Sequence, residues 1–461
     1  MNDRTCIMEE KDKEYIWHPF TQMREWVADT PLIIESGKGS YLIDTEGRRY
    51  IDGFSSVWVN IHGHRKKAID KAITEQLKRI AHSTLLGLSN IPSILLAEKL
   101  IRVAHNSGLF SLSKVFYSDN GSTAVEAGLK MAFQYWQLKG GGYRDKTKFL
   151  ALENAYHGDT IGSVSLGGID LFHKLYKPLL FETIKVPSPN CYRCPIDKNH
   201  PDCNLACIRE AEKVLKRHHH ETAAFVIEPL IQAAAGMIVS PPGYLSQISS
   251  LCKQYNVLLI ADEVATGFGR TGRMFACEHE DVTPDIMAIA KGITGGYLPL
   301  AATLVTEDIY NAFLGEYKEF KTFFHGHSYT GNPLGCAAAI ANIDIFEKEN
   351  VLHHVRVKSS LLEKLLRQLK DHPHVGDIRQ KGLMAGIELV KDKSSKAPYP
   401  LEDKAGYRVC LEARNMGLIL RPIGNVIILI PPLSISSAIL KKMVAIIAAA
   451  IETVTGNGFQ Q

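Results

Sequence analysis

The chain has 461 residues, of which 45% are hydrophobic and 22% charged, an ordinary composition for a globular protein of about two or three domains that excludes a disordered chain. The formal net charge of +4 is small and no long run of Lys or Arg occurs, so nucleic acid is a poor candidate for a partner. No segment reaches about 18 uninterrupted apolar residues and the N-terminus is polar, so we expect neither a membrane span nor a signal peptide and predict a cytoplasmic protein.

The first 70 residues show short strands with alternating apolar positions, for example at 39–44. From residue 71 to 329 the pattern changes to short continuous apolar runs separated by long helical stretches, of which 122–138 is the clearest. The expected strands of this part are residues 114–118, 148–152, 223–228 and 257–262. Continuous apolar runs of this length predict a largely parallel sheet covered by helices on both faces.

The sequence pattern of residues 330–461 again differs from that of the central part. It includes a strand-like run near 426 and a buried helix near the C-terminus. We therefore predict an α/β protein in which residues 71–329 form a large domain around a mostly parallel sheet. Residues 1–70 and 330–461 together form a smaller α+β domain. Ligand sites of such sheets lie at the carboxyl ends of the strands, where Glu228 and Asp262 fall.

The nine cysteines are odd in number and five are scattered, which favours free thiols in a reducing compartment over a disulfide framework. The other four form two close pairs, Cys191 with Cys194 and Cys203 with Cys207, around a polar loop. Four thiols at this spacing could hold a tetrahedral zinc ion. Because the loop is an insertion between strand-like segments and the second pair begins a helical pattern, we favour incidental cysteines on a surface loop and predict no metal.

Two residue types that are costly to bury stand close together in the middle of the chain. The apolar strand at 257–262 ends on Asp262 and Glu263, and Lys291 follows in a glycine-rich stretch. An ionised carboxylate is costly to bury without a cation or a strong donor. An acid that pairs with a protonated ring nitrogen and an amine that forms a Schiff base are two groups that pyridoxal phosphate (PLP) chemistry requires. Taken singly, these residues are explained as well by a helix cap and a solvated lysine.

Two further segments could hold the rest of such a cofactor. Gly121 and Ser122 follow a strand and open a helix, where glycine lets the backbone approach an anion and the hydroxyl adds a donor at the positive end of the helix dipole. Tyr156 comes directly after the strand at 148–152 and could stack on a flat ring. A plain helix cap and an incidental tyrosine in a turn are the alternative interpretations.

Three other features have weaker interpretations. Residues 267–272 (GFGRTG) formally match the dinucleotide fingerprint, but two carboxylates stand before the glycines and no glycine-packed helix follows, so a nicotinamide site is a weak alternative. The loop at 323–333 is dense in glycine and hydroxyls and could offer donors to an anion. Arg421 is either a surface arginine or a forked partner for a substrate carboxylate.

Several of these segments resemble the motifs of the class III aminotransferases, which are PLP enzymes of fold type I. They are residues 262–272 (DEVATGFGRTG), 290–292 (AKG) and 326–333 (GHSYTGNP). Within that class, residues 16–21 (IWHPFT), 52–63 (DGFSSVWVNIHG) and 156–160 (YHGDT) are similar to the enzymes of biotin synthesis that convert 8-amino-7-oxononanoate to 7,8-diaminononanoate. The resemblance extends from about residue 15 to about residue 450.

The resemblance implies a role for each matching residue of the cofactor site. Lys291 binds the cofactor covalently and then moves the proton between the substrate α-carbon and the cofactor, in a ping-pong cycle. Asp262 keeps the pyridine nitrogen protonated, and Tyr156 packs against the ring. Gly121 and Ser122 hold the phosphate.

The resemblance also implies a homodimer whose active sites are shared between subunits. His327 and Ser328, which follow Gly326 in the loop at the substrate site, reach the phosphate held by the other subunit. Arg421 binds the carboxylate of the oxo-acid, and Trp58 lines its aliphatic tail.

The choice of amino donor depends on positions where the chain departs from the pattern of the enzymes that use S-adenosylmethionine. Those enzymes have Tyr in place of Phe20, Trp-Trp in place of Val57-Trp58, and Pro-Thr in place of His327-Ser328. Losing a hydroxyl and an indole removes a hydrogen-bond donor and a stacking face from the donor pocket. We therefore favour L-lysine as the donor, with S-adenosylmethionine second; Ser328 can still donate to the phosphate in place of Thr.

The nearest alternative function is that of another class III aminotransferase, acting on ω-amino acids or diamines, which would share every cofactor-binding residue named above. A protein of the same fold that binds the cofactor without turnover is a more distant alternative, and it is disfavoured because Lys291 is intact.

Overall fold

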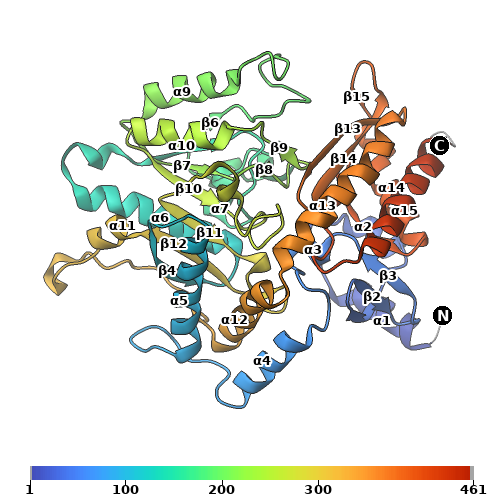
Figure 1. The fold of residues 1–461 in the computed structure, drawn as a ribbon, viewed down its shortest axis with the longest axis horizontal. Helices are drawn as coiled ribbons and strands as arrows, with labels where there is room; N and C mark the ends of the chain where they lie inside the picture. The colour runs from blue at the N-terminus through green and yellow to red at the C-terminus, as the bar shows by residue number, and fades with distance from the viewer. Residues whose placement is uncertain (1–2, 457–461) are drawn as a thin grey trace.

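The computed structural model describes residues 3–456. Figure 1 shows a large helix-covered sheet at one end of the molecule, while the N-terminal and C-terminal segments lie together at the other end. The predicted architecture of a large sheet domain beside a smaller α+β part is confirmed. The domain boundaries near residues 70 and 330 stay a prediction.

The large sheet has seven strands. In spatial order the strands are β4 (Leu112–Ser118), β12 (Ala301–Thr306), β11 (Ile286–Ile289), β10 (Leu258–Asp262), β7 (Thr222–Ile227), β5 (Lys148–Leu152) and β6 (Thr183–Val186). Four of them, β4, β5, β7 and β10, coincide with the predicted apolar runs. Strand β12 pairs antiparallel with both of its neighbours, and every other pairing is parallel. The prediction of a largely parallel sheet is therefore correct.

Both faces of this sheet are buried, which explains why its strands are continuously apolar. Along β10, Leu259 and Ala261 belong to one buried cluster while Leu258 and Ile260 belong to another, as expected for side chains that alternate between faces. The helices that pack around the sheet are α5 (Ile91–Asn106), α6 (Gly121–Lys139), α9 (Ala206–His218), α10 (Tyr244–Gln254) and α11 (Glu307–Ala312). Shorter elements are α7 (Ile161–Leu166), α8 (Asp170–His173), β8 (Ile231–Gln232) and β9 (Ile238–Val239).

The two ends of the chain meet in a second, four-stranded sheet. Strands β1 (Ile34–Lys38), β2 (Tyr41–Asp44) and β3 (Arg49–Asp52) form antiparallel pairs, and β16 (Leu418–Ile419) joins them parallel to β3. A further sheet is formed by β13 (Val375–Lys381), β14 (Met384–Asp392), β18 (Val426–Leu429) and β17 (Arg421–Ile423), with β15 (Ala397–Pro398) on β14.

The helices of these end segments are α1 (Asp3–Tyr15), α2 (Met23–Ala28), α13 (Val351–Arg367), α14 (Ala405–Asn415) and α15 (Ser437–Gly456). Two helices lie where the end segments meet the large sheet: α4 (Lys67–Leu77) packs on α12 (Pro333–Lys348), and α12 also contacts α5. No helix within residues 3–456 is both long enough and apolar enough to cross a membrane.

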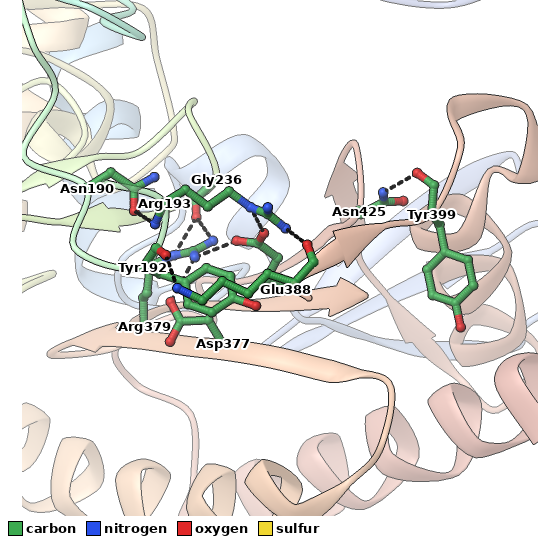
Figure 2. A network of polar contacts seen from close by, with 10 residues as sticks. Asn190, Tyr192, Arg193, Gly236, Asp377, Arg379, Glu388, Tyr399 and Asn425 are labelled. Carbon is green, nitrogen blue, oxygen red and sulfur yellow. Dashed lines mark hydrogen bonds and ion pairs between the residues drawn. The ribbon is translucent and has the colours of Figure 1, made fainter. Parts of the chain in front are cut away.

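The cysteine-bearing loop between β6 and α9 is tied to the sheet of the C-terminal segment by an ion-pair network. Figure 2 shows Arg193 from the loop and Arg379 from β13 converging on Glu388 of β14, each at 2.6 Å. Arg379 also donates to the carbonyl oxygen of Gly236 at 2.8 Å, next to β9. Within residues 3–456, no three His, Cys, Asp or Glu side chains are grouped closely enough to hold a metal ion.

Candidate active site

A cavity of about 470 Å³ opens at the carboxyl ends of the parallel strands, as predicted for a sheet of this kind. Strand β10 delivers Asp262 to its wall, Glu228 follows β7, and helix α6 begins beside it after β4. The predicted site residues that line this central cavity are Trp58, Gly121, Ser122, Tyr156, Asp262 and Lys291.

Lys291 opens a tight turn directly after β11 and points into the central cavity. Its backbone has a φ of 44°, and the side-chain amide of Asn342 in α12 holds the turn by donating to the carbonyls of Gly292 and Ile293, each at 3.0 Å. Although the side chain keeps some accessible surface, the protein around the amine excludes bulk water and lowers the pKa of Lys291. The Nζ atom lies 4.7 Å from the centroid of the Trp58 ring. A lowered pKa makes the amine easier to deprotonate, which suits a group that acts as a nucleophile.

Asp262 is held at the floor of the cavity by two hydrogen bonds. Its Oδ2 accepts from His157 Nδ1 at 2.7 Å, and its Oδ1 accepts from the backbone N–H of Val264 at 3.0 Å. Asp262 and His157 are both buried, and among residues 3–456 His157 Nε2 has no hydrogen-bond partner. No role was predicted for His157, although it directly follows Tyr156 in the chain. Because a carboxylate only accepts, His157 carries its proton on Nδ1 and orients the acid.

Glu228 is a second buried carboxyl group beside this pair. Its Oε1 accepts from the N–H of Tyr156 at 3.1 Å, and its Oε2 accepts from the N–H of Ala233 at 2.9 Å. Burial outweighs these two donors and raises the pKa of Glu228 to about 7.

This shift predicts a specific pH dependence of stability. Between pH 4.5 and about 7 the folded protein keeps the Glu228 proton that the unfolded chain releases, so stability falls as the pH rises through this window. We expect Glu228→Gln to flatten that decline, as measured by the melting temperature at intervals across the window, whereas the exposed Glu347→Gln leaves it unchanged. The comparison uses the slopes of melting temperature against pH and not the melting temperatures themselves. The reason is that Glu228→Gln also removes the oxygen that accepts from the N–H of Ala233 and so lowers stability at every pH. Identical slopes for Glu228→Gln and the unmutated protein would contradict the prediction.

The start of α6 offers a narrow cradle for an anion. Asn120 caps the helix by accepting from the N–H of Thr123 at 3.1 Å. A Cβ atom at Gly158, where φ is 124°, would lie 1.9 Å from Ser122 Oγ, and one at Gly121 would lie 2.6 Å from a methyl group of Val264. Only glycine fits at these two tightly packed positions, and both residues line the cavity beside the N-terminus of α6, where N–H groups attract a phosphate.

Tyr156 lies on the wall of the cavity within an aromatic cluster. Its hydroxyl donates to Asp159 at 2.8 Å, and its ring is stacked on His173 with 6.3 Å between centroids. Burial raises the pKa of the Tyr156 hydroxyl, so the phenol stays neutral. The edge of Phe172 packs on both Tyr156 and Phe20, which links the cavity to the N-terminal segment.

The other predicted substrate residues lie outside the lining of the central cavity. Phe20 and Val57 are 56% and 51% exposed. Arg421 is exposed beside Phe20: its guanidinium donates to the Phe20 carbonyl at 3.4 Å and lies 5.9 Å from the ring centroid. The loop carrying Gly326, His327 and Ser328 contributes nothing to this cavity in its own chain. The roles of these residues stay predictions.

Residues 267–272 do not form a dinucleotide-binding turn. They lie in a series of turns, and a short 3-10 helix from Ala276 to Glu280 follows instead of a glycine-packed helix. Arg270, in the middle of this segment, is fully buried. The weak alternative of a nicotinamide site is therefore not supported by the geometry.

The cavity fits the cofactor that the residues suggest. Lys291 and Asp262 offer the amine and the acid, Tyr156 and Trp58 offer flat apolar faces, and the glycine cradle at the start of α6 leaves room for a phosphate. The buried Asp262 carboxylate accepts from His157 and Val264 and keeps lone pairs for a further proton donor, such as a pyridinium nitrogen.

Comparison with known proteins gives the class. A family model described as aminotransferase class-III matches residues 22–451, so the chain belongs to the class III aminotransferases. It is 54% identical over 455 residues to an adenosylmethionine-8-amino-7-oxononanoate aminotransferase of Nitratidesulfovibrio vulgaris, covering 99% of this chain and 83% of that protein. It is 52% identical to the protein of the same name from Geobacter sulfurreducens, covering 98% and 99%.

Solved structures agree on the fold. An adenosylmethionine-8-amino-7-oxononanoate aminotransferase from Methanocaldococcus jannaschii has a TM-score of 0.92 at 48% identity and covers 97% of this chain and 99% of its own. An omega transaminase from Pseudomonas jessenii in complex with PMP has a TM-score of 0.92 at 33% identity, covering 97% and 98%. The chain is thus a PLP-dependent transaminase of fold type I.

Proposed function

We propose that this enzyme transfers an amino group to 8-amino-7-oxononanoate and forms 7,8-diaminononanoate, a step of biotin synthesis. The observation that carries the proposal is the identity of 50–54% over nearly the whole chain with several proteins whose names give this acceptor. The arrangement of Lys291, Asp262 and His157 in one cavity supports a working transaminase.

In this proposal each residue acts through the chemistry described for the cavity. PLP, when bound, would supply an electron-accepting ring. Lys291 would anchor it, take the proton from the α-carbon of the donor and later return one to the acceptor carbon. Asp262 would hold the proton on the ring nitrogen, with His157 fixing the carboxylate, and Tyr156 would offer its face to the ring.

The remaining residues bind the phosphate and the substrate. Gly121 and Ser122 would donate hydrogen bonds to the phosphate at the helix N-terminus. Trp58 lines the aliphatic tail of the oxo-acid, whose carboxylate pairs with Arg421. This last role is supported by the position of Arg421 beside Phe20 and the aromatic cluster that leads to the cavity.

We further propose a homodimer in which Gly326, His327 and Ser328 complete the active site of the partner subunit. The proposal is supported by two observations: this loop lies away from the cavity of its own chain, and it carries exposed aromatic side chains at Phe324 and Tyr329. A cytoplasmic location stays a prediction from the sequence.

The amino donor has two candidates, each supported by a different observation. The names of the relatives contain adenosylmethionine. The residues Phe20, Val57 and His327 depart from the pattern of the enzymes that use that donor, which favours L-lysine as the donor of this chain.

A half-reaction separates the donors. The holoenzyme is mixed with L-lysine or with S-adenosylmethionine, without any acceptor, and the visible absorbance of the bound cofactor is followed. We expect L-lysine to bleach it. Bleaching by S-adenosylmethionine alone would show that Phe20, Val57 and His327 do not set the donor, while leaving the proposed acceptor unchanged.

A second candidate function is favoured by the solved structures named as omega transaminases, which share the fold at 33% identity. After the half-reaction, 8-amino-7-oxononanoate, pyruvate and 2-oxoglutarate are offered separately as acceptors. Return of the visible absorbance with 8-amino-7-oxononanoate supports the proposed function. If only the two oxo-acids restore it, the enzyme acts on ω-amino acids or diamines instead.

A further inference from the structure

The segment that carries Trp58 has an unusual backbone. Residues Ser55 to Trp58, labelled α3, form a single left-handed turn with φ values of 53°, 49°, 66° and 70°. None of the four residues is glycine, and Val57 is β-branched, the type least suited to this region. Such a backbone persists only where the surrounding structure determines it, and it is characteristic of functional sites.

The first anchor of this left-handed turn is the buried carboxylate of Asp52. Its Oδ1 accepts from the N–H of Ser56 and its Oδ2 from the Ser56 hydroxyl, each at 2.9 Å. His64 Nε2 lies 2.9 Å from the same Oδ2 and fixes the carboxylate from the other side. Asp52 therefore holds the start of the turn.

The second anchor is Arg270, whose side chain is only 1% exposed. Its Nη2 donates to the carbonyls of Trp58 at 3.0 Å and Asn60 at 2.9 Å. Its Nη1 donates to the Ser55 hydroxyl at 3.3 Å and to the carbonyl of Pro431 at 2.8 Å. One planar guanidinium thus joins both ends of the left-handed turn to the C-terminal segment, a geometry that a single ammonium group cannot reproduce.

The two anchors, Asp52 and Arg270, fix the direction of the Trp58 side chain by holding the left-handed turn. The indole lies over the Lys291 amine, 4.7 Å from ring centroid to Nζ, and Trp58 and Val59 both line the central cavity. In an ordinary right-handed or extended backbone the Cβ atoms of residues 55–58 would leave in other directions. The wall of the cavity nearest the reactive amine therefore depends on the left-handed conformation.

We propose that Arg270 is a positioning residue for the transamination: it holds the left-handed turn so that Trp58 forms the substrate wall over Lys291. Arg270 itself lies outside the lining of the cavity. The inference rests on the proposed function for the identity of the substrate, and on the turn geometry alone for the position of the indole.

The test uses Arg270→Lys in the holoenzyme, with the exposed Arg273→Lys as matched control. The first readout needs no substrate: it is the quenching by bound cofactor of the Trp58 emission, obtained by subtracting the Trp58→Phe variant of each protein. We expect Arg270→Lys to lose most of this quenching. The KM for 8-amino-7-oxononanoate should rise on the order of tenfold, as for lost hydrogen bonds to a charged group. The visible spectrum of the cofactor and its pH titration should not change, because Lys291 and Asp262 are intact.

A rescue variant separates positioning from a general loss of stability. Glycine adopts the left-handed region freely, and the Val57 side chain carries no polar group that could anchor the turn, so Val57→Gly in the Arg270→Lys background should restore part of the quenching and lower the KM again. If Arg270 were merely structural, this glycine would only loosen the protein further. Should Arg270→Lys not fold, Asp52→Asn provides the same test from the other anchor, because the amide keeps one acceptor for Ser56.

The outcomes are distinct. Unchanged Trp58 quenching and unchanged KM in Arg270→Lys, or a glycine that worsens both, would overturn the proposal. Loss of quenching in Arg270→Lys, together with an unmutated enzyme that does not turn over 8-amino-7-oxononanoate, would support the positioning role and would refute the proposed substrate.

Discussion

Replacing Lys291 by Ala is expected to abolish transamination while leaving the fold intact. The variant loses the group that anchors the cofactor and moves the substrate proton, and no other lysine lines the central cavity within residues 3–456. Covalent and proton-transfer catalysis together predict a loss in kcat on the order of 10⁴-fold or more. The measurement is kcat with 8-amino-7-oxononanoate and an excess of donor, together with the visible absorbance after adding cofactor.

Stability should not follow activity in this variant. Because the surroundings of Lys291 lower the pKa of its amine, the protonated form is disfavoured in the folded protein, so removing it does not sacrifice a stabilising interaction at neutral pH. We expect a melting temperature equal to or slightly above that of the unmutated protein. Lys253→Ala, at an exposed position of α10, is the control and should keep full activity. Turnover by Lys291→Ala at a near-normal rate would refute the assignment of the amine.

Much of the cofactor site could be predicted from the sequence because it follows from local rules. Parallel strands place the residues at their carboxyl ends along one edge of the sheet, so Asp262 and Glu228 come together because β10 and β7 are neighbours. The start of α6 reaches the same cavity from β4, although β12 and β11 separate β4 from β10. Lys291 joins them because β11 is paired directly with β10. The same rule could have placed His157 in the site, since it directly follows Tyr156 in the segment after β5.

The conformation of the substrate wall around Trp58 could not be predicted, because it depends on contacts between residues far apart in the sequence. Nothing in the stretch Ser55 to Trp58 indicates a left-handed turn, because it contains no glycine or asparagine. The turn is imposed by Arg270, which is 215 residues from Ser55 in the chain, and by the carbonyl of Pro431 on the same guanidinium. The fingerprint-like glycines around Arg270 suggested a weak nucleotide site, whereas the segment delivers a buried arginine that donates to the backbone behind the cavity wall. Tertiary contacts, and not the local backbone preferences of these residues, determine the conformation here.

The second large effect is expected from Asp262→Asn, which changes one atom in the floor of the cavity. The amide oxygen can still accept from His157 or from the N–H of Val264, so the backbone of β10 and the fold should be preserved. What is lost is the negative charge that keeps a proton on the ring nitrogen of the cofactor. Without that proton the ring accepts electrons poorly, and loss of such electrostatic stabilisation predicts a fall in kcat on the order of 10²- to 10³-fold.

Two measurements establish whether charge, not shape, is responsible for the loss in Asp262→Asn. The first is kcat beside Asp285→Asn, a control at the opposite end of the same strand pair, where the side-chain oxygen accepts from the N–H of Leu259 and the amide can continue to do so. The second is the visible spectrum of the bound cofactor as a function of pH, which should shift only in Asp262→Asn, because only there does the ring nitrogen lose its partner. Equal kcat values and equal spectra for the two variants would mean that the ring nitrogen faces another residue. In that case the buried pair of His157 and Asp262 would be a structural feature of the β10 strand end.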